Sequence, residues 1–182
     1  MLQQITEKIV IPEGVTVEIA GSIVKAKGPK GENEKNISHP KIVISKKSDT
    51  EIEIACKKAK KREKTMLYSF VAHIKNLMEG VRAGFTYKLK MCFSHFPMSV
   101  SVEKDEVVIK NFLGEKIPRK SKIFPGVHVK VDGSIIVVEG IDKESVSATA
   151  ARIEQATRIT NRDRRVFQDG CYVIERAGIP VE

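Results

Sequence analysis

The chain has 182 residues and a formal charge of +9, with 32 Lys and Arg against 23 Asp and Glu. Hydrophobic residues make up 41%, enough for one large or two small packed domains, and with 5% aromatic residues the core must be mainly aliphatic. The charge favours polyanionic partners, nucleic acid before anionic membrane. No apolar run approaches the roughly 20 residues of a membrane span, and the first residues lack a signal-peptide pattern, so we expect a cytoplasmic protein without a membrane partner.

The first part of the chain predicts a series of strands. Val15, Val17 and Ile19 alternate with polar residues. This period of two is typical of strands with one buried and one solvated face. The same interpretation holds for segments 21–32, 41–45 and 51–55.

The motif KGPKGE (27–32) has two interpretations. Its glycines and lysines suggest a phosphate-binding loop, but Glu32 follows Gly31 where a Walker motif requires lysine, and a carboxylate repels phosphate. Its Gly-Pro and Lys-Gly pairs are typical of turns. We therefore expect a tight turn between two strands.

A helix is predicted from about Lys60 to Glu79, with Gly80 as its C-terminal cap. Its first turns are the run KKAKKREK (57–64), in which six cations, against a single acid, oppose the helix dipole. The run is either a solvated helix end or a phosphate contact. On the second interpretation, the candidate RNA-binding residues are Lys60, Lys61 and Arg62.

The second part predicts a similar series. A strand over 85–93 carries alternating Leu89, Met91 and Phe93. A second helix begins near Asp142, a suitable N-cap, and ends near Arg158 or Ile159. Between them lie further strand patterns in 104–115, 127–131 and 134–140.

These two series are an internal repeat. At an offset of 83 residues Val24 falls on Val107 and Lys27 on Lys110, and at an offset of 84 residues Ile52 falls on Ile136. The predicted fold class is α+β: two similar tandem domains from internal duplication, each an antiparallel or mixed sheet packed with one main helix. We expect the domains to span 1–82 and 83–182, with a basic RNA-binding tail from about residue 158.

Arginine is concentrated in that tail. Residues 1–82 hold 14 Lys among 16 cations, whereas residues 83–182 hold 7 of the 9 arginines. The planar guanidinium matches phosphate with two parallel hydrogen bonds, which lysine cannot do. The candidate RNA-binding residues of the tail are Arg158, Asn161, Arg162, Arg164 and Arg165.

Other residues of the tail have supporting roles. Asp163 is expected to orient its arginine neighbours, and Asp169 with Gly170 to make the turn toward the strand-like segment CYVIE. Phe167 and Tyr172 either stack on unpaired bases or anchor the tail. The alternative for the whole tail is intramolecular pairing of its arginines with its aspartates.

A third basic cluster is GEKIPRKSK (114–122). It is either a soluble hairpin connection or a further phosphate contact. Its candidate RNA-binding residues are Lys116, Arg119, Lys120 and Lys122.

Signals of chemistry are lacking. The three cysteines, at 56, 92 and 171, form no CxxC pair and are typical of reduced thiols. The four histidines, at 39, 73, 95 and 128, have no ligand spacing, and no serine has a GxSxG context. We expect no catalytic residue, metal, cofactor or small-molecule substrate.

The run 148–173, ATAARIEQATRITNRDRRVFQDGCYV, resembles the C-terminal signature of the L-six family of large-ribosomal-subunit proteins, in its eukaryotic and archaeal branch (the eukaryotic L-nine type). The segment GFTYKLKMCFSHFP (84–97), NFLGEK (111–116) and the start IPEGVTVEI are also similar to that family. The likeness covers essentially the whole chain. Glu154 departs from the pattern, since the family often has glutamine there, and this face of the helix is expected to point away from RNA.

The resemblance implies a function. Members of the family have two duplicated α+β domains and bind large-subunit ribosomal RNA near the sarcin–ricin loop and stalk base, where translational GTPases dock. It implies neighbouring large-subunit ribosomal proteins as partners, a place in cytoplasmic ribosomes, and nucleolar assembly in a eukaryote. Two alternatives remain open: a cytosolic protein-interaction module, and a hydrolase whose dispersed His and Asp residues converge.

Overall fold

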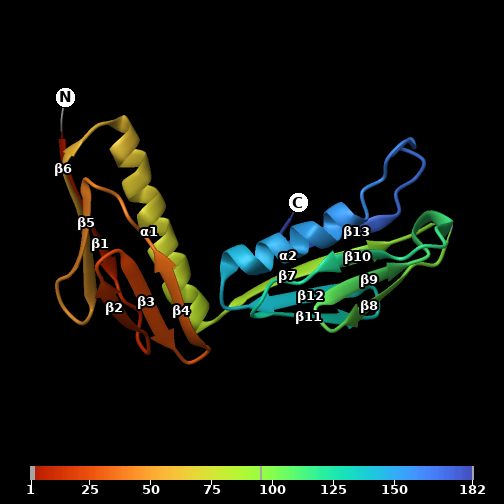
Figure 1. Ribbon diagram of the computed structural model, residues 1–182, viewed down its shortest axis with the longest axis horizontal. Helices are drawn as coiled ribbons and strands as arrows, with labels where there is room; N and C mark the ends of the chain where they lie inside the picture. Colours follow the sequence, from red (N-terminus) through yellow and green to blue (C-terminus); the bar gives the residue numbers. More distant parts are fainter. Residues whose placement is uncertain (1–2, 95, 182) are drawn as a thin grey trace. The chain divides into compact units, whose positions relative to one another are not determined.

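The computed structural model describes residues 3–94 and 96–181, so His95 lies outside the described residues. The chain divides into two compact units, Met1–Gly84 and Phe85–Glu182, and each is described by itself (Figure 1).

The first unit contains two three-stranded antiparallel sheets and one long helix. Buried Ile52 and Ile54 alternate along one strand with partly exposed glutamates, and Leu67 and Ile74 lie on the inner face of the helix. This aliphatic contact forms the core of the unit. The sheets have the orders β1-β6-β5 and β2-β3-β4, and the elements are β1 (Gln3–Val10), β2 (Thr16–Ala20), β3 (Ile23–Gly28), β4 (Gly31–Asn36), β5 (Ile42–Lys46), β6 (Glu51–Ala59) and α1 (Lys61–Arg82).

The KGPKGE motif is confirmed as a tight turn. Gly28 pairs with Gly31 where β3 passes into β4. The amide of Lys30 donates to the carbonyl oxygen of Val81 in α1 at 2.9 Å. A Cβ atom on Gly28 would lie 2.6 Å from that oxygen, so the close approach of turn and helix requires glycine.

The second unit repeats this plan and extends it. Its sheets have the orders β11-β12-β7-β13-β14 and β10-β9-β8, and its helix packs against β7, β13, β10 and β12. Every strand pair between described residues is antiparallel. The elements are β7 (Phe85–Cys92), β8 (Ser99–Glu103), β9 (Glu106–Lys110), the 3-10 turn η1 (Phe112–Gly114), β10 (Arg119–Lys122), β11 (Val127–Asp132), β12 (Ile135–Gly140), α2 (Lys143–Ala156), β13 (Gly170–Arg176) and β14 (Ile179–Pro180).

The α+β fold and the internal repeat are confirmed. Val24 and Val107 occupy equivalent buried positions on β3 and β9, and Ile52 and Ile136 do so on β6 and β12. The strands from β1 to β6 and α1 correspond in order to the strands from β7 to β12 and α2. Only β13 and β14 have no counterpart among the described strands of the first unit, and the chain reaches them through the predicted tail.

Several predicted boundaries are wrong. Lys57 and Lys58 belong to β6, and α1 begins only at Lys61, because the Glu63 carboxylate accepts from the Lys60 amide at 3.0 Å and closes the first turn there. Gly80 is buried within α1 and is not its cap. The helix ends at Arg82, and Gly84 supplies the left-handed residue, with φ of 78°, just beyond it.

In the second unit, too, the helix and one strand end at other residues than the sequence predicts. Asp142 is confirmed as the N-cap of α2, accepting from the amides of Glu144 and Ser145. The helix ends at Ala156 rather than near Arg158, and the Arg119 side chain donates to the carbonyl oxygen of Ala156 at 2.8 Å. Strand β7 ends at Cys92, so Phe93 leaves the sheet and is exposed.

Candidate nucleic-acid interface

The segment 158–168, called the arginine loop, joins α2 to β13 (Figure 1). All five candidate RNA-binding residues of the loop are exposed. The chain reverses at residues 164–166, so the prediction of a turn at Asp169 and Gly170 is wrong. Gly170 instead begins β13 and pairs with Cys92 of β7.

Asp169 is buried instead of forming a turn, with 1% of its surface exposed. Its Oδ1 atom accepts from the Ser94 amide at 2.9 Å and from the Ser94 hydroxyl at 3.0 Å. These bonds fasten the end of the arginine loop to the segment that follows β7. A buried carboxylate needs such donors, which explains why Asp169 could not serve as an exposed turn residue.

Asp163 and Arg165 form an internal pair in the arginine loop. The Arg165 Nη2 atom donates to Asp163 Oδ2 at 2.8 Å, and the Arg165 amide donates to Asp163 Oδ1 at 2.9 Å. The side-chain hydrogen bond from Arg165 lowers the pKa of Asp163, with a further contribution from the amide. Asp163 therefore orders the loop and offsets part of its positive charge.

The two aromatic residues near the loop have different environments. Phe167 is partly buried against the core of the second unit, and the Arg162 guanidinium lies 4.8 Å from the centre of its ring. Tyr172 is 42% exposed, and its hydroxyl donates to the Gln168 carbonyl oxygen at 3.2 Å. The geometry thus favours the anchoring alternative for Phe167 and leaves the ring of Tyr172 accessible.

Arg119 connects the arginine loop with the segment 114–122, called the lysine loop, although its last four residues are strand β10 and not the loop that the sequence predicts. Its guanidinium binds both carboxylate oxygens of Glu115, at 2.8 and 2.6 Å, and donates to the carbonyl oxygen of Ala156 at 2.8 Å. It also lies 4.3 Å from the centre of the Phe112 ring. These contacts occupy the guanidinium, so Arg119 has a structural role and presents no free fork to a phosphate.

Arg119 brings the two basic loops to one end of the second unit (Figure 1). The lysines of the lysine loop remain exposed there, although Lys120 lies 3.3 Å from Glu106. The pKa of Glu115 is lowered mainly by the hydrogen bond from Arg119 and more weakly by the charge of Arg162. Glu115 therefore lies close to both loops. The exposed lysines are Lys116, Lys120 and Lys122.

Glu154 is directed into the unit. Its Oε1 atom lies 3.5 Å from the Val173 amide nitrogen of β13, at the limit of a hydrogen bond. Thr157, the C-cap residue of that helix, accepts from the buried Cys171 amide at 2.9 Å. The end of α2 is therefore held against β13, and the arginine loop begins from a fixed point.

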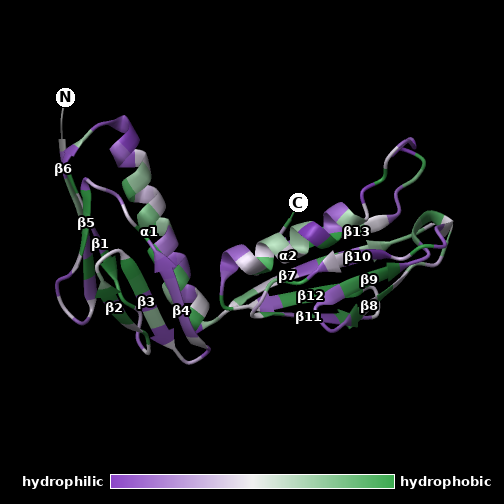
Figure 2. Cartoon of the chain, viewed as in Figure 1, coloured by the Kyte–Doolittle hydropathy of each residue, from purple (hydrophilic) through white to green (hydrophobic). Residues whose placement is uncertain are grey.

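The basic cluster of the first unit lies at the hydrophilic start of α1 (Figure 2). Lys60, Lys61 and Arg62 are exposed. Glu63 is buried and accepts from Lys41 Nζ at 2.7 Å, which together with the Lys60 amide lowers its pKa to about 2. The capping role of Glu63 was not predicted from the sequence, although a glutamate three residues after an N-cap is its recognised signal.

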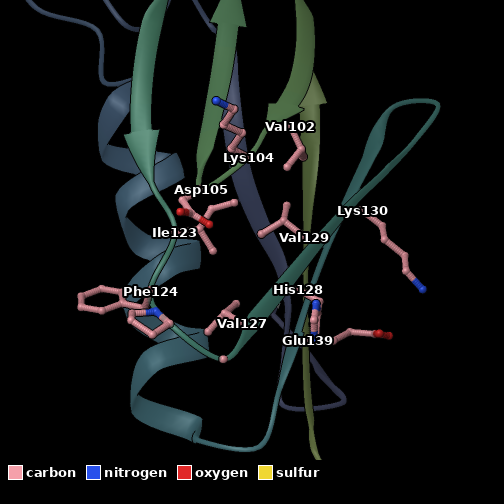
Figure 3. A pocket seen from close by; sticks show the side chains of 12 residues that line it. Val102, Lys104, Asp105, Ile123, Phe124, Val127, His128, Val129, Lys130 and Glu139 are labelled. Atoms are coloured by element: carbon pink, nitrogen blue, oxygen red, sulfur yellow. The ribbon is translucent and has the colours of Figure 1, made fainter.

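A hollow of about 740 Å³ lies beside β11 (Figure 3). One wall of the hollow is apolar and consists of Val102, Val127 and Val129. His128 of β11 and Glu139 of β12 lie opposite each other on paired strands. No serine, threonine or cysteine belongs to the described lining. The hollow therefore offers an acid and an imidazole but no hydroxyl or thiol for them to activate.

Two further observations bear on chemistry. Burial raises the pKa of the Cys171 thiol to about 12, so it is protonated at neutral pH and a poor nucleophile. Within residues 3–94 and 96–181, no group of three or more His, Cys, Asp or Glu side chains could hold a metal ion. No described helix is both long and apolar enough to cross a bilayer.

Comparison with known proteins gives the family. The model of the family described as "Ribosomal protein L6" matches residues 11–84 and 96–170. The chain belongs to the ribosomal protein L6 family. The large ribosomal subunit protein uL6 of Aeropyrum pernix is 48% identical over 172 residues, 94% of each chain, and that of Ignicoccus hospitalis is 49% identical over 170 residues, 91% of each. The uL6 of Methanosarcina mazei is 45% identical and covers 97% of this chain and 100% of its own.

The two matched stretches of the L6 family correspond to the two structural units, one in each. This agreement confirms both the resemblance found in the sequence and the internal duplication. L6 is a family of ribosomal constituents and not of enzymes, which removes the hydrolase alternative.

Proposed function

We propose that this protein is a structural constituent of the large ribosomal subunit and binds large-subunit ribosomal RNA in the cytoplasm. The observation that carries the proposal is the convergence of the two basic loops at one end of the second unit, where Arg119 joins them. Membership of the L6 family supports the ribosomal location.

The contact is electrostatic and shape-dependent. Arg158, Arg162 and Arg164 are exposed on a loop whose two ends are fixed by buried hydrogen bonds at Thr157 and Asp169. A loop held in this way loses little conformational freedom when its arginines bind phosphates. Affinity then falls with salt in proportion to the phosphates neutralised, and RNA shape supplies specificity.

The finer location is also part of the proposal. The arginine loop and the exposed lysines of the lysine loop contact RNA near the sarcin–ricin loop and the stalk base, beside the docking site of translational GTPases. Neighbouring large-subunit proteins complete the surroundings. The cationic start of α1 makes a separate contact through Lys60, Lys61 and Arg62.

Sedimentation tests the ribosomal assignment. Cell extract is fractionated on a gradient with and without ribonuclease, and the protein is expected with large subunits only when RNA is intact. Binding that survives ribonuclease and moderate salt indicates a protein-interaction module and contradicts the proposal.

A triple substitution tests the loop. Replacement of Arg162, Arg164 and Arg165 by alanine is expected to reduce incorporation into large subunits, while Arg176→Ala, a change of another exposed arginine, serves as control. Unchanged incorporation contradicts the role of the loop. Chemical footprinting of the RNA in subunits with and without the protein tests the proposed neighbourhood: protection is expected at the sarcin–ricin loop and stalk base.

A further inference from the structure

A second hollow, of about 700 Å³, lies between the segment that follows β7 and the arginine loop. We call it the ring hollow, because Phe93 and Tyr172 both line it, together with Val166 and Arg164. It lies at the end of the unit where the two basic loops meet.

Its apolar walls are unusually open to solvent. Phe93 is 49% exposed, Tyr172 is 42% exposed and Val166 is 59% exposed. Aromatic side chains normally bury most of their surface in the core. A group of three large apolar side chains around one hollow, on a strongly basic end of the protein, indicates a binding surface more than an incomplete core.

The walls are also fixed in position. The hydrogen bonds from Ser94 to Asp169 Oδ1 join the segment of Phe93 to the residue that precedes β13. The Tyr172 hydroxyl donates to the Gln168 and Asp169 carbonyl oxygens, which holds its ring over the loop end. The ring hollow is therefore formed before any ligand arrives, which lowers the entropic cost of binding.

Two polar groups of the ring hollow can form further hydrogen bonds or ion pairs. Asp169 Oδ2 is buried and has no hydrogen-bond donor among the described residues. Arg164 is exposed, and within the described parts of the chain no hydrogen bond or ion pair engages its guanidinium. Arg164 and Tyr172 also line a smaller adjoining hollow of about 240 Å³ at the end of α2.

We propose that the ring hollow receives an unpaired base of the bound RNA, an inference that rests on the proposed function. The base stacks on Tyr172 and Phe93, and Arg164 binds a phosphate of the same nucleotide. Aromatic faces stack on any unpaired base, and a guanidinium pairs well with phosphate. The amino groups of bases and the ribose 2′-hydroxyl are donors of the kind that Asp169 Oδ2 lacks.

Phe93 is the informative residue of this proposal. The alternation of the β7 segment predicts it as part of the sheet, whereas the structure places it beyond the strand and in the wall of the hollow. Substitution of a ring also distinguishes base stacking from purely electrostatic binding, because it removes a stacking surface without removing a charge.

The test measures binding of the full-length protein to purified large-subunit ribosomal RNA over a series of salt concentrations. Phe93→Ala and Tyr172→Leu are each expected to weaken binding roughly 5- to 150-fold, the range of one base stack. The slope of log affinity against log salt is expected to stay unchanged, since no phosphate contact is lost. Phe93→Tyr, which keeps the ring, is expected to retain near wild-type affinity. Tyr172→Phe keeps the ring but loses the hydroxyl bonds that hold it, and is expected to bind RNA more tightly than Tyr172→Leu.

A matched control lies in the first unit. Tyr68→Leu removes an exposed tyrosine that is not part of the lining. This variant is expected to bind RNA as the wild type does. Circular dichroism identifies any variant that fails to fold, and the exposed position of Phe93 makes Phe93→Ala the variant on which the test depends.

The outcomes are distinct. If wild-type protein binds the RNA and Phe93→Ala binds equally well, the ring hollow does not hold a base and the inference is overturned. The same conclusion follows if Phe93→Ala binds naked RNA normally but is not incorporated into subunits, because the hollow then receives a neighbouring protein. If the wild type fails to bind the RNA even at low salt, the proposed function itself is contradicted.

Discussion

Arg119 donates to the carbonyl oxygen of Ala156, the last residue of α2, across 37 positions of the chain. The same guanidinium donates hydrogen bonds to both carboxylate oxygens of Glu115 and lies over the Phe112 ring. One side chain thereby caps a helix, closes the lysine loop and sets its distance from the arginine loop.

Arg119→Lys is expected to lower the free energy of unfolding of the second unit by about 2 kcal/mol, the scale of hydrogen bonds to a charged group. Lysine keeps the charge but cannot make the fork or the flat contact with Phe112. Chemical denaturation measures the change. Lys120→Ala, at the exposed neighbouring position, is expected to stay within about 0.5 kcal/mol of the wild type, and equal stability of Arg119→Lys and wild type would refute the structural role.

Thr157→Val is expected to destabilise the second unit by about 1–3 kcal/mol, because it removes the acceptor of the buried Cys171 amide without changing the side-chain shape. Hydrogen exchange gives a local readout: the Cys171 amide should lose protection before the rest of β13. Thr160→Val, at an exposed position, is the control. Full protection of Cys171 in Thr157→Val would show that the hydrogen bond contributes nothing to holding β13.

Glu63 should make the first unit sensitive to acid. Its pKa is lowered from 4.5 to about 2 in the folded protein, first by the hydrogen bond from Lys41. A lowered pKa contributes stability that is complete above pH 4.5 and is lost as the pH falls toward 2. We expect Glu63→Gln to melt below the wild type at neutral pH and the difference to shrink over that interval. A difference independent of pH would contradict the charged state of Glu63.

Arg164→Ala is expected to reduce the salt dependence of RNA binding by about one unit of slope, the effect of losing one phosphate contact. The physical reason is that Arg164 is exposed and engaged by no described acid, whereas Arg165 is paired with Asp163. Affinity measured at several salt concentrations gives the slope. Arg176→Ala is expected to leave it unchanged, and a similar loss in both variants would indicate a non-specific charge effect.

The sequence predicted the fold well because its signals are local. Alternating apolar residues identified the strands of both repeats, and the offsets that align Val24 with Val107 and Ile52 with Ile136 revealed the duplication. Helix ends were predicted less well. Gly80 looked like a cap, yet α1 continues to Arg82 because its buried face packs beyond that glycine through Val81.

In the candidate site, too, some features were predicted correctly from the sequence and others were not. The exposure of the tail arginines agrees with the sequence analysis, but Asp169 was placed in a turn and is instead a buried acceptor for Ser94. Phe93 was placed in a strand and lies in a hollow. Both errors concern contacts between distant segments, which residue patterns do not encode.

The sequence by itself determined that this protein is a duplicated α+β chain of the L6 type with arginine concentrated near its end, because periodicity, repetition and composition are properties of neighbouring residues. Only the tertiary structure decided which cations are occupied and which are free. Arg119 and Arg164 look alike in the sequence, yet one meets a carboxylate and a helix end while the other reaches solvent. That difference depends on partners brought together by folding, since a guanidinium is satisfied by geometry and not by its place in a run of charges.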